Sequence, residues 1–317
     1  MNPQAMPPAS LPTIDMATFT AGAPDTKARL IAAVSRELGF FNLVKHGLSD
    51  AFHADQLEWG RRFFALPLDE MLAVDFRPSP VRRDYEPMAL QTLQARIPPD
   101  QKEGFSLGCE PLPGVRLRDP LQDFEGRNQW PRAHSGFDAE GFRAQMEAYR
   151  GAMVALGREI CGLIAASLGL AEDYFAEAFA QPNATVRLLH YPPLSAESTL
   201  GRLGCGANTD WGSITLLLQD DCGGLEATPA PGAMIINLGD MVVRVTGGRD
   251  ASNVDRVLPP APDRDRYSVA TFFNPHADYT IDHAPTWAPE RDRLNPITFA
   301  DHINAMVAKT YAAPAEA

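Results

Sequence analysis

The chain changes character after Pro182, and this change restricts the possible folds more than any other feature of the sequence. Beyond that residue, short segments rich in Val, Ile, Leu, Thr and Phe alternate with turns of Gly, Pro and Asp. Eight segments predict strands: TVRLLHY, CGANTD, SITLLLQ, GGLEAT, AMIINL, DMVVRVT, NVDRVL and YSVATFFN. Many short strands separated by turns are typical of a β-sandwich or a β-barrel.

The part of the chain before Pro182 is expected to be mainly helical. From residue 138 onward, apolar side chains recur every three or four positions over about thirty residues, which predicts one long helix. Ser49 or Asp50 can cap another helix over residues 49–66. The remaining helices are predicted at 25–39, 168–180 and, at the end of the chain, 296–311.

Two short strands, LPTIDM and FFNLVKHG, precede a region with little periodicity at residues 76–135. Its many Pro, Gly and charged residues predict loops. Arg82, Arg83 and Tyr85 lie there and could contact an acidic or aromatic substrate, although solvated loop side chains explain them as well. Helices followed by a β core indicate an α+β fold. We expect one integrated unit with two parts, residues 1–135 and residues 136–317.

Composition and charge exclude several classes of protein. The 317-residue chain carries a formal net charge of -12 and has no run of Lys or Arg, so we expect no nucleic-acid partner. Its four cysteines are scattered, which argues against a disulfide framework and against a zinc knuckle. No signal peptide and no apolar run long enough to span a membrane is apparent. We therefore expect a soluble cytoplasmic protein that acts on a small molecule and has no membrane partner.

Three features of the β half could carry chemistry. Asn208 and Asp210 are two residues apart, so on a strand both side chains point to the same face. Asp255 lies on a separate predicted strand. Arg266 and Ser268 place a guanidinium and a hydroxyl on one face, which suits a carboxylate. Each feature alone also has an ordinary structural explanation, such as turn chemistry or a surface ion pair.

Taken together and in order, these segments resemble the iron(II)/2-oxoglutarate-dependent oxygenases, in the branch similar to isopenicillin N synthase. ELGFFNLVKHGL and FFALPLDEMLA are similar to the N-terminal region of that family. VRLLHYPP, GANTDWGSITLLLQDDCGGLE, PGAMIINLGDMVVRVTGG, VDRVLPP and RYSVATFFNP are similar to its core. The resemblance covers nearly the whole chain. It implies a double-stranded β-helix, or jelly-roll, flanked by N-terminal and C-terminal helices.

The resemblance also implies roles for individual residues. Asp210 matches the acidic ligand of a His-x-Asp…His iron site, while Asn208 and Asp255 stand where that family has its two histidines. Arg266 and Ser268 match the pair that holds a carboxylate of 2-oxoglutarate or of a substrate. Tyr191 stands where a tyrosine often helps to bind these ligands. His190 is the best of the other histidines as a replacement ligand, but a buried, hydrogen-bonded histidine is the more usual explanation.

The replaced histidines leave three functions open. The first is a metal-dependent oxygenase with Asn208, Asp210 and Asp255 as weak ligands, because amide and carboxylate oxygens favour ions harder than Fe(II). The second is a non-redox enzyme that uses the same pocket, with Asp210 or Asp255 as general acid or base. The third is an inactive binding or partner subunit, because a fold alone does not guarantee activity. The chain also lacks a Trp-containing strand that the family usually has after GGLEATPAPGA.

Overall fold

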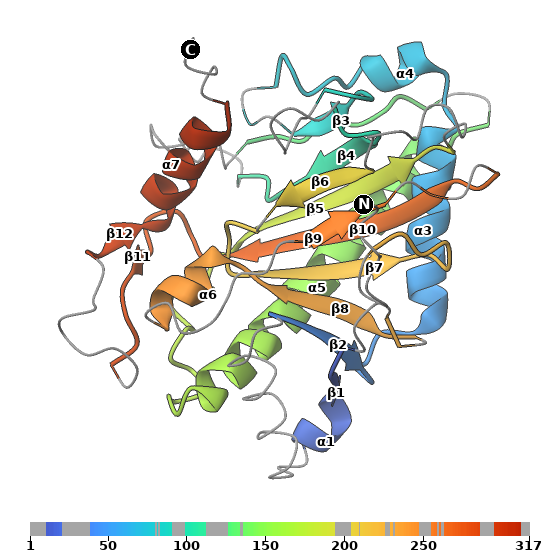
Figure 1. Ribbon diagram of the computed structural model, residues 1–317. Coiled ribbons are helices and arrows are strands. Elements are labelled where there is room, and N and C mark those ends of the chain that lie inside the picture. Colours follow the sequence, from blue (N-terminus) through green and yellow to red (C-terminus); the bar gives the residue numbers. More distant parts are fainter. Residues whose placement is uncertain are drawn as a thin grey trace, which may run out of the picture.

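The computed structural model describes residues 11–20, 39–79, 81, 83–90, 99–111, 126–133, 136–193, 204–208, 210–225, 229–230, 232–246, 255–258, 260, 263–285 and 295–311. Its centre is a mixed sheet with the strand order β1-β2-β8-β7-β10-β5-β4-β3 (Figure 1). Only the β1–β2 pair of this sheet is parallel. The eight strands are β1 (Thr13–Asp15), β2 (Phe40–Val44), β8 (Met234–Leu238), β7 (Ile214–Gln219), β10 (Arg266–Asn274), β5 (Asn183–Tyr191), β4 (Glu103–Leu107) and β3 (Asp84–Glu86).

A second, two-stranded sheet of β6 (Cys205–Asn208) and β9 (Asp255–Val257) lies across β5 and β10 (Figure 1). At Gly204, next to β6, an added Cβ would lie only 3.0 Å from the ring of Tyr191 on β5. The two sheets thus face each other at close range. This arrangement confirms the predicted α+β fold with a jelly-roll core. Strands β1–β4 join the same large sheet as the later strands, whereas the boundary at residue 135 stays a prediction.

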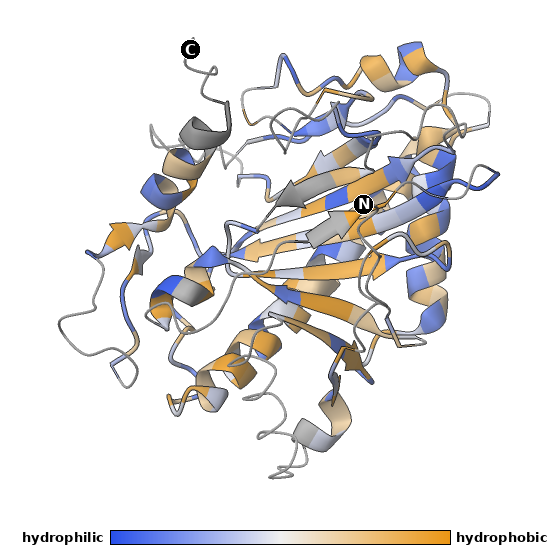
Figure 2. Ribbon diagram, viewed as in Figure 1, coloured by the Kyte–Doolittle hydropathy of each residue, from blue (hydrophilic) through white to orange (hydrophobic). Residues whose placement is uncertain are grey.

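Side chains alternate along β5 and β10, as a period of two requires. On one face of the sheet, Val186 and Leu188 of β5 and Val269 and Phe273 of β10 are buried in the main hydrophobic core. This face packs against α3 (Asp50–Phe64) and α5 (Ala139–Ser167). Figure 2 shows hydrophobic residues concentrated in the central strands. The other face is turned toward β6 and β9, and it carries the candidate site residues.

The two long helices begin and pack as the sequence predicts. The Ser49 side chain caps α3 by accepting a hydrogen bond from the amide of Phe52, and Asp138 caps α5 in the same way. The periodic residues of α5 from Phe142 to Ile160 are buried in the core. The helix predicted at 25–39 lies outside the described residues, except for Gly39.

Three other expectations are wrong, and a fourth, the GGLEAT strand, lies only partly within the described residues. DMVVRVT forms a helix, α6 (Asp240–Val245), instead of a strand. The amides of Asp240 and Met241 donate to the carbonyls of Asp210 and Gly212, so tertiary contacts override the strand propensity of its valines. Residues 168–180 form successive turns, and the described part of GGLEAT contributes only an isolated bridge at Leu225. The 76–135 region contains β3 and β4.

The remaining elements are short, apart from the C-terminal helix. They are α1 (Met16–Thr20), α4 (Leu68–Leu72), the β11–β12 pair (Thr280–Ile281 and Ile297–Thr298) and α7 (Phe299–Tyr311). Helix α7 confirms the helix predicted at the end of the chain. In the described residues, no helix is both long enough and apolar enough to cross a membrane.

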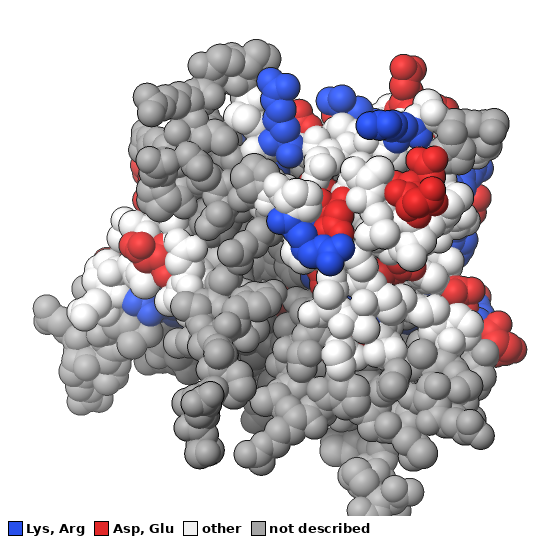
Figure 3. Space-filling model, turned by 90° about the horizontal axis from the view of Figure 1, so that it is seen from above, with Lys and Arg blue, Asp and Glu red and all other residues white. Residues whose placement is uncertain are grey.

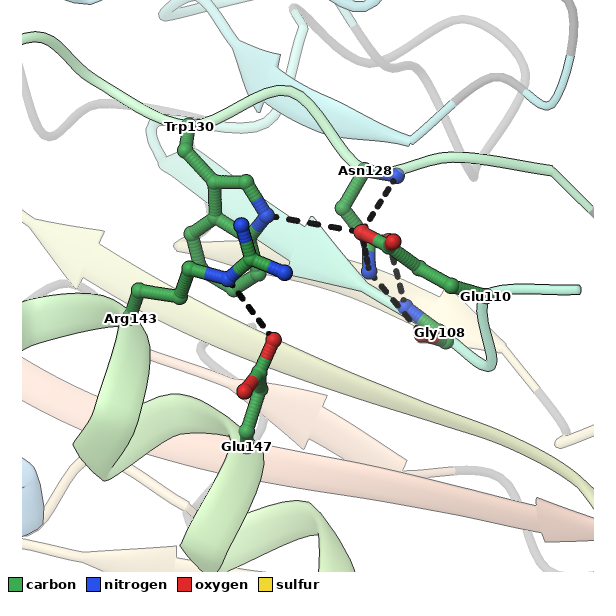
Figure 4. A network of polar contacts seen from close by, with 6 residues as sticks. All are labelled: Gly108, Glu110, Asn128, Trp130, Arg143 and Glu147. Atoms are coloured by element: carbon green, nitrogen blue, oxygen red, sulfur yellow. Dashed lines mark hydrogen bonds and ion pairs between the residues drawn. The ribbon is translucent and has the colours of Figure 1, made fainter. Parts of the chain in front are cut away.

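A polar network fixes the chain segment that enters α5 (Figure 4). One carboxylate oxygen of Glu110 accepts hydrogen bonds from the Asn128 backbone and side chain and from the Trp130 indole. Arg143 of α5 lies over the Trp130 ring, 5.2 Å from its centre, and donates to Glu147. The network ties this loop region to the helix. Arg83 and Tyr85 are also buried and hydrogen-bonded to protein groups, so neither is an exposed loop contact for a substrate.

Two glycines of α5 allow a matched test of its packing. At Gly157, an added Cβ would lie 2.7 Å from the Phe273 ring of β10, whereas at Gly151 nothing lies within 4 Å. Phe273 is fully buried and stacked on Phe179, so it cannot move easily. We expect Gly157→Ala to lower the free energy of unfolding by about 1–2 kcal/mol despite the better helix propensity of alanine.

Gly151→Ala should instead raise the free energy of unfolding, by up to about 1 kcal/mol. Urea denaturation of the two variants and the parent measures both effects. Equal stabilisation by the two substitutions would contradict the described contact between α5 and β10.

Candidate active site

A pocket of about 300 Å³ lies between the large sheet and the β6–β9 pair. Alternate residues of β5 and β10 line it, including Tyr191, Arg266 and Ser268, and Asp210 lies in the same lining. Ile303 of α7 contributes to the wall, so the C-terminal helix borders the pocket. A volume at the lower end of the usual range for ligand sites suits small molecules.

Arg266 and Ser268 come together as predicted. Arg266 is the cross-strand partner of Tyr191, and its guanidinium lies 4.7 Å from the centre of the Tyr191 ring. Its Nη1 donates to the Ser268 hydroxyl at 3.2 Å, its Nη2 to the Gln219 side chain at 2.9 Å and its Nε to the Gly223 carbonyl at 2.6 Å. These contacts fix the plane of the guanidinium beside the hydroxyl.

The charge of Arg266 is not neutralised by any carboxylate among the described residues, since the groups that accept its hydrogen bonds are all neutral. The residue is only 1% exposed. A buried cation without an anionic partner is costly, and a bound anion removes that cost. The geometry therefore suits a ligand carboxylate at Arg266 and Ser268. Burial raises the pKa of the neighbouring Tyr191 hydroxyl, although Arg266 opposes the shift, so the phenol stays neutral.

Asp210 lies two residues beyond the end of β6, and its side chain is hydrogen-bonded to residues of the large sheet. Its Oδ2 accepts hydrogen bonds from the Thr215 hydroxyl at 2.5 Å and from the Asn237 amide at 2.7 Å. Removal from water raises the pKa of the Asp210 carboxyl, and these two hydrogen bonds only partly offset the effect. Its other oxygen, Oδ1, has no hydrogen-bond donor among the described residues.

Asn208 and Asp255 are brought together at the level of the backbone. They are directly opposed partners in the antiparallel β6–β9 pair. Asp210 follows Asn208 by two residues. The side chains of Asn208 and Asp255 lie outside the part of the chain whose side chains are described. The register thus agrees with a shared site, and the roles of these residues as ligands or catalysts stay predictions.

Histidine is missing from the described lining of the pocket. His190 is on the opposite face of β5, where it stacks on Tyr267 with ring centres 4.7 Å apart. Its two ring nitrogens lie 2.7 Å from Glu103 Oε1 and 2.7 Å from Asp265 Oδ1. His190 is therefore a structural, hydrogen-bonded histidine, and it does not replace a missing metal ligand.

The two carboxylates around His190 predict a pH dependence of stability. Burial lowers the pKa of His190, but Glu103 and Asp265 outweigh burial, so its pKa in the folded protein is raised. A raised folded pKa stabilises the protein fully below the unfolded value of about 6.5 and loses this contribution as pH rises through the folded value. We expect the free energy of unfolding to fall over this interval in the parent and to fall less in His190→Gln. Urea unfolding of the parent and of His190→Gln measures both profiles. The range runs from pH 5.5 to pH 8.5, which is roughly one unit below and two units above the pKa of an unfolded histidine. If the free energy of unfolding changes with pH equally in both proteins, His190 is not the group responsible for the pH dependence.

The chain matches known proteins along nearly its whole length. Residues 11–133 match the family of N-terminal regions of the non-haem dioxygenases in morphine synthesis. Residues 182–275 match the 2OG-Fe(II) oxygenase superfamily. The 2-oxoglutarate-Fe(II) type oxidoreductase hxnY of Emericella nidulans is 32% identical, covering 96% of this chain and 92% of that protein. The 2-oxoglutarate-dependent dioxygenase citB of Monascus ruber is 35% identical, covering 95% of each chain. This chain therefore belongs to the 2-oxoglutarate-Fe(II) oxygenase superfamily.

Solved structures agree with this assignment. A full-length protein of Neurospora crassa, crystallised in complex with alpha-KG, superposes with a TM-score of 0.82 at 27% identity, covering 98% of this chain and 100% of that chain. JOX2 in complex with 2OG, Fe and JA has a TM-score of 0.74 at 26% identity, covering 97% of this chain and 88% of that chain. 2-Oxoglutarate and Fe(II) are accordingly the cosubstrate and the metal of the superfamily.

The residues predicted to hold a metal do not fit an imidazole-based iron site. The positions supply one amide and two carboxylates, at Asn208, Asp210 and Asp255. Within the described residues, no group of three His, Cys, Asp or Glu side chains could hold a metal ion. Oxygen-only sets favour harder ions than Fe(II). The buried Arg266–Ser268 pair predicted to hold a carboxylate is thus present, whereas the three positions predicted to hold a metal carry no imidazole.

Sequence reasoning missed four pocket residues. Thr215 and Asn237 hold Asp210, while Lys102 and Arg187 line the wall near Tyr191. The sequence could have identified Arg187 as a pocket residue, because Arg187 precedes Tyr191 by four residues on one strand and so lies on the same face of the sheet. The other three residues could be placed in the pocket only once the pairing of the strands was known.

Proposed function

We propose that this protein binds 2-oxoglutarate, or the carboxylate of a closely similar ligand, at Arg266 and Ser268, and that it does so without a redox-active iron. The observation that carries the proposal is the buried guanidinium of Arg266, which is oriented by Ser268, Gln219 and Gly223 and has no described acidic partner. A site of this kind binds a carboxylate through charge-assisted hydrogen bonds.

The proposed loss of iron chemistry follows from the donor set. Replacing both imidazoles by an amide and a carboxylate removes the ligands to which Fe(II) is best suited. It also adds a negative charge at the metal position, since two carboxylates stand where the superfamily has one. We therefore propose that the protein does not carry out iron-dependent oxygenation, although its relatives are named as a 2-oxoglutarate-Fe(II) type oxidoreductase and a 2-oxoglutarate-dependent dioxygenase.

Metal analysis tests this proposal. The full-length protein is loaded with Fe(II) in the absence of oxygen, with 2-oxoglutarate present, and then desalted. We expect it to retain less than roughly a tenth of an equivalent of iron, since few ligands of the right type are available. Retention near one equivalent would refute this part of the proposal and would support the working oxygenase.

Asp210 favours a second candidate function, metal-independent acid–base catalysis. Its carboxyl lies in the same pocket as Arg266 and has a raised pKa, which suits a general base that works near neutral pH. Bound 2-oxoglutarate has C–H bonds next to its keto group. Asp210 would accept a proton from that carbon and return one to it, which leaves the ligand chemically unchanged in water.

Proton exchange measures this activity directly. In deuterated water, NMR would follow the loss of the proton signal at the carbon next to the keto group. We expect the parent to accelerate exchange and Asp210→Asn to remove the acceleration, while 2-oxoglutarate still binds. An exchange rate equal in both proteins would exclude Asp210 as the base and would leave a binding function.

A further inference from the structure

Arg187 is a cation of the pocket wall, and its side chain is mostly buried. Its Nη2 pairs with Glu86, but its Nε is buried and has no hydrogen-bond partner among the described residues. The side chain folds over Gly104 of β4, where an added Cβ would lie 3.1 Å from that Nε. Arg187 lines the pocket and its side chain is 16% exposed, so a pocket ligand can reach this side chain at atoms other than the buried Nε.

Lys102 adds a second positive charge to this wall. Its side chain is 5% exposed, and its Nζ lies 2.9 Å from Asp100 Oδ2 and 2.9 Å from Cys205 Sγ. Burial and the neighbouring Arg187 lower the pKa of Lys102, the adjacent Cys205 and Asp100 raise it, and the net shift is upward, so the ammonium keeps its charge. Lys102 lines the pocket, whereas its acidic partner and that of Arg187, namely Asp100 and Glu86, do not.

Arg187 is separate from the carboxylate anchor at Arg266. Arg266 is the cross-strand partner of Tyr191, and Ala270 is the partner of Arg187. The two arginines thus start four residues apart along the sheet, about 13 Å at the rise of a β-strand. Arg187 lies between the Arg266 level and the level of Thr215 and Asn237, which hold Asp210. A ligand that is held at Arg266 and extends toward Asp210 passes the level of Arg187, so a second molecule bound at Arg187 must lie beside the first.

We propose that Arg187 and Lys102 form a second anion subsite, which binds the carboxylate of a small substrate while 2-oxoglutarate occupies Arg266. The inference rests on the proposed function only for the identity of the first ligand. The Arg187 guanidinium supplies a positive charge and N–H donors for a carboxylate, and the Lys102 ammonium supplies a second charge from the β4 side of the pocket. The substrate class is thus a small organic acid, and an uncharged analogue of the same shape should bind poorly.

Ligand-observed NMR titrations of the full-length protein test this subsite, with a chelator and saturating 2-oxoglutarate present. The probes are benzoate and its uncharged counterpart benzamide. We expect benzoate to bind at least about tenfold more tightly than benzamide, since a charge-assisted hydrogen bond is lost with the amide. Arg187→Gln should weaken benzoate binding by about tenfold or more and should leave the affinity for 2-oxoglutarate within about twofold of the parent.

Arg62→Gln is the matched control, because Arg62 lies on the exposed side of α3 and pairs with Glu58. It should leave both ligands unaffected. Arg187→Lys keeps a charge for Glu86 and guards against loss of folding in the glutamine variant. It should still weaken benzoate binding severalfold while 2-oxoglutarate binds normally.

Several results would overturn the subsite: no benzoate binding by the parent, equal binding of benzamide, parent-like binding by Arg187→Lys, or competition between benzoate and 2-oxoglutarate. If the parent does not bind 2-oxoglutarate at all, the proposed function fails by itself. The same titrations without 2-oxoglutarate would then still decide whether the binding of benzoate depends on Arg187.

Discussion

Replacing Arg266 by glutamine should weaken the binding of 2-oxoglutarate by about 100-fold or more, because two charge-assisted hydrogen bonds and the compensation of a buried charge are lost together. Arg266 is almost fully buried, so solvent does not screen its interaction with a ligand. Isothermal titration calorimetry of the parent and the variant, in the presence of a chelator, measures the difference.

Two companion variants separate charge from geometry at this site. Arg266→Lys keeps the charge but loses the planar fork, so its affinity should fall between those of the parent and the glutamine variant. Ser268→Ala removes a single neutral partner and should cost about tenfold or less. If Arg266→Gln binds 2-oxoglutarate as the parent does while remaining folded by circular dichroism, the anchor has been placed wrongly.

Restoring both histidines should give the largest gain of function. We expect the double variant Asn208→His plus Asp255→His to bind Fe(II) more than about 100-fold more tightly than the parent, since it changes two direct ligands rather than groups behind them. The β6–β9 register already places the two positions opposite each other. The variant should also convert 2-oxoglutarate to succinate in the presence of oxygen, which the parent should not do.

Succinate formation and retained iron are measured on the same preparations. The matched control is Asn208→Ala plus Asp255→Ala, which removes the oxygen donors without adding imidazoles and should do neither. A double-histidine variant that folds and binds 2-oxoglutarate but retains no more iron than the alanine control would show that the barrel itself, and not only the ligands, has changed.

The sequence predicts most of the fold because local patterns and packing agree in its main elements. The apolar step along α5 and the alternation along β5 and β10 match the buried faces in the structure. The DMVVRVT segment shows where local reasoning fails. Its valines favour a strand, but the chain turns at Gly239 and the first helix amides donate to carbonyls far away in sequence. A single segment does not reveal such contacts.

The candidate site likewise contains some residues that the sequence predicts and others that it does not. Arg266 and Ser268 share a face by alternation alone, so the sequence could pair them. Lys102 lies outside a strand and is 85 residues before Arg187 (187 minus 102). Only the β4–β5 pairing brings these two to one wall of the pocket. His190 shows that neighbours in the sequence can be separated by the sheet. It is adjacent to Tyr191 in the chain and therefore lies on the opposite face.

Charge on the surface agrees with a small-molecule site. Figure 3 shows Lys and Arg interspersed with Asp and Glu on the described part of the upper face, without a large basic patch. The net charge of -12 points the same way. The Arg266 guanidinium, which no described carboxylate neutralises, lines the pocket and is therefore available to a ligand that enters it.

The affinity for 2-oxoglutarate measured by calorimetry without oxygen, once with a chelator and once with excess Fe(II), tests the central proposal most directly. If Arg266 and Ser268 hold the ligand and the metal position contributes nothing, the two dissociation constants should agree within about twofold. Tightening by Fe(II) of about tenfold or more, or binding that requires the metal, would contradict the proposal and would assign the protein to the working iron oxygenases.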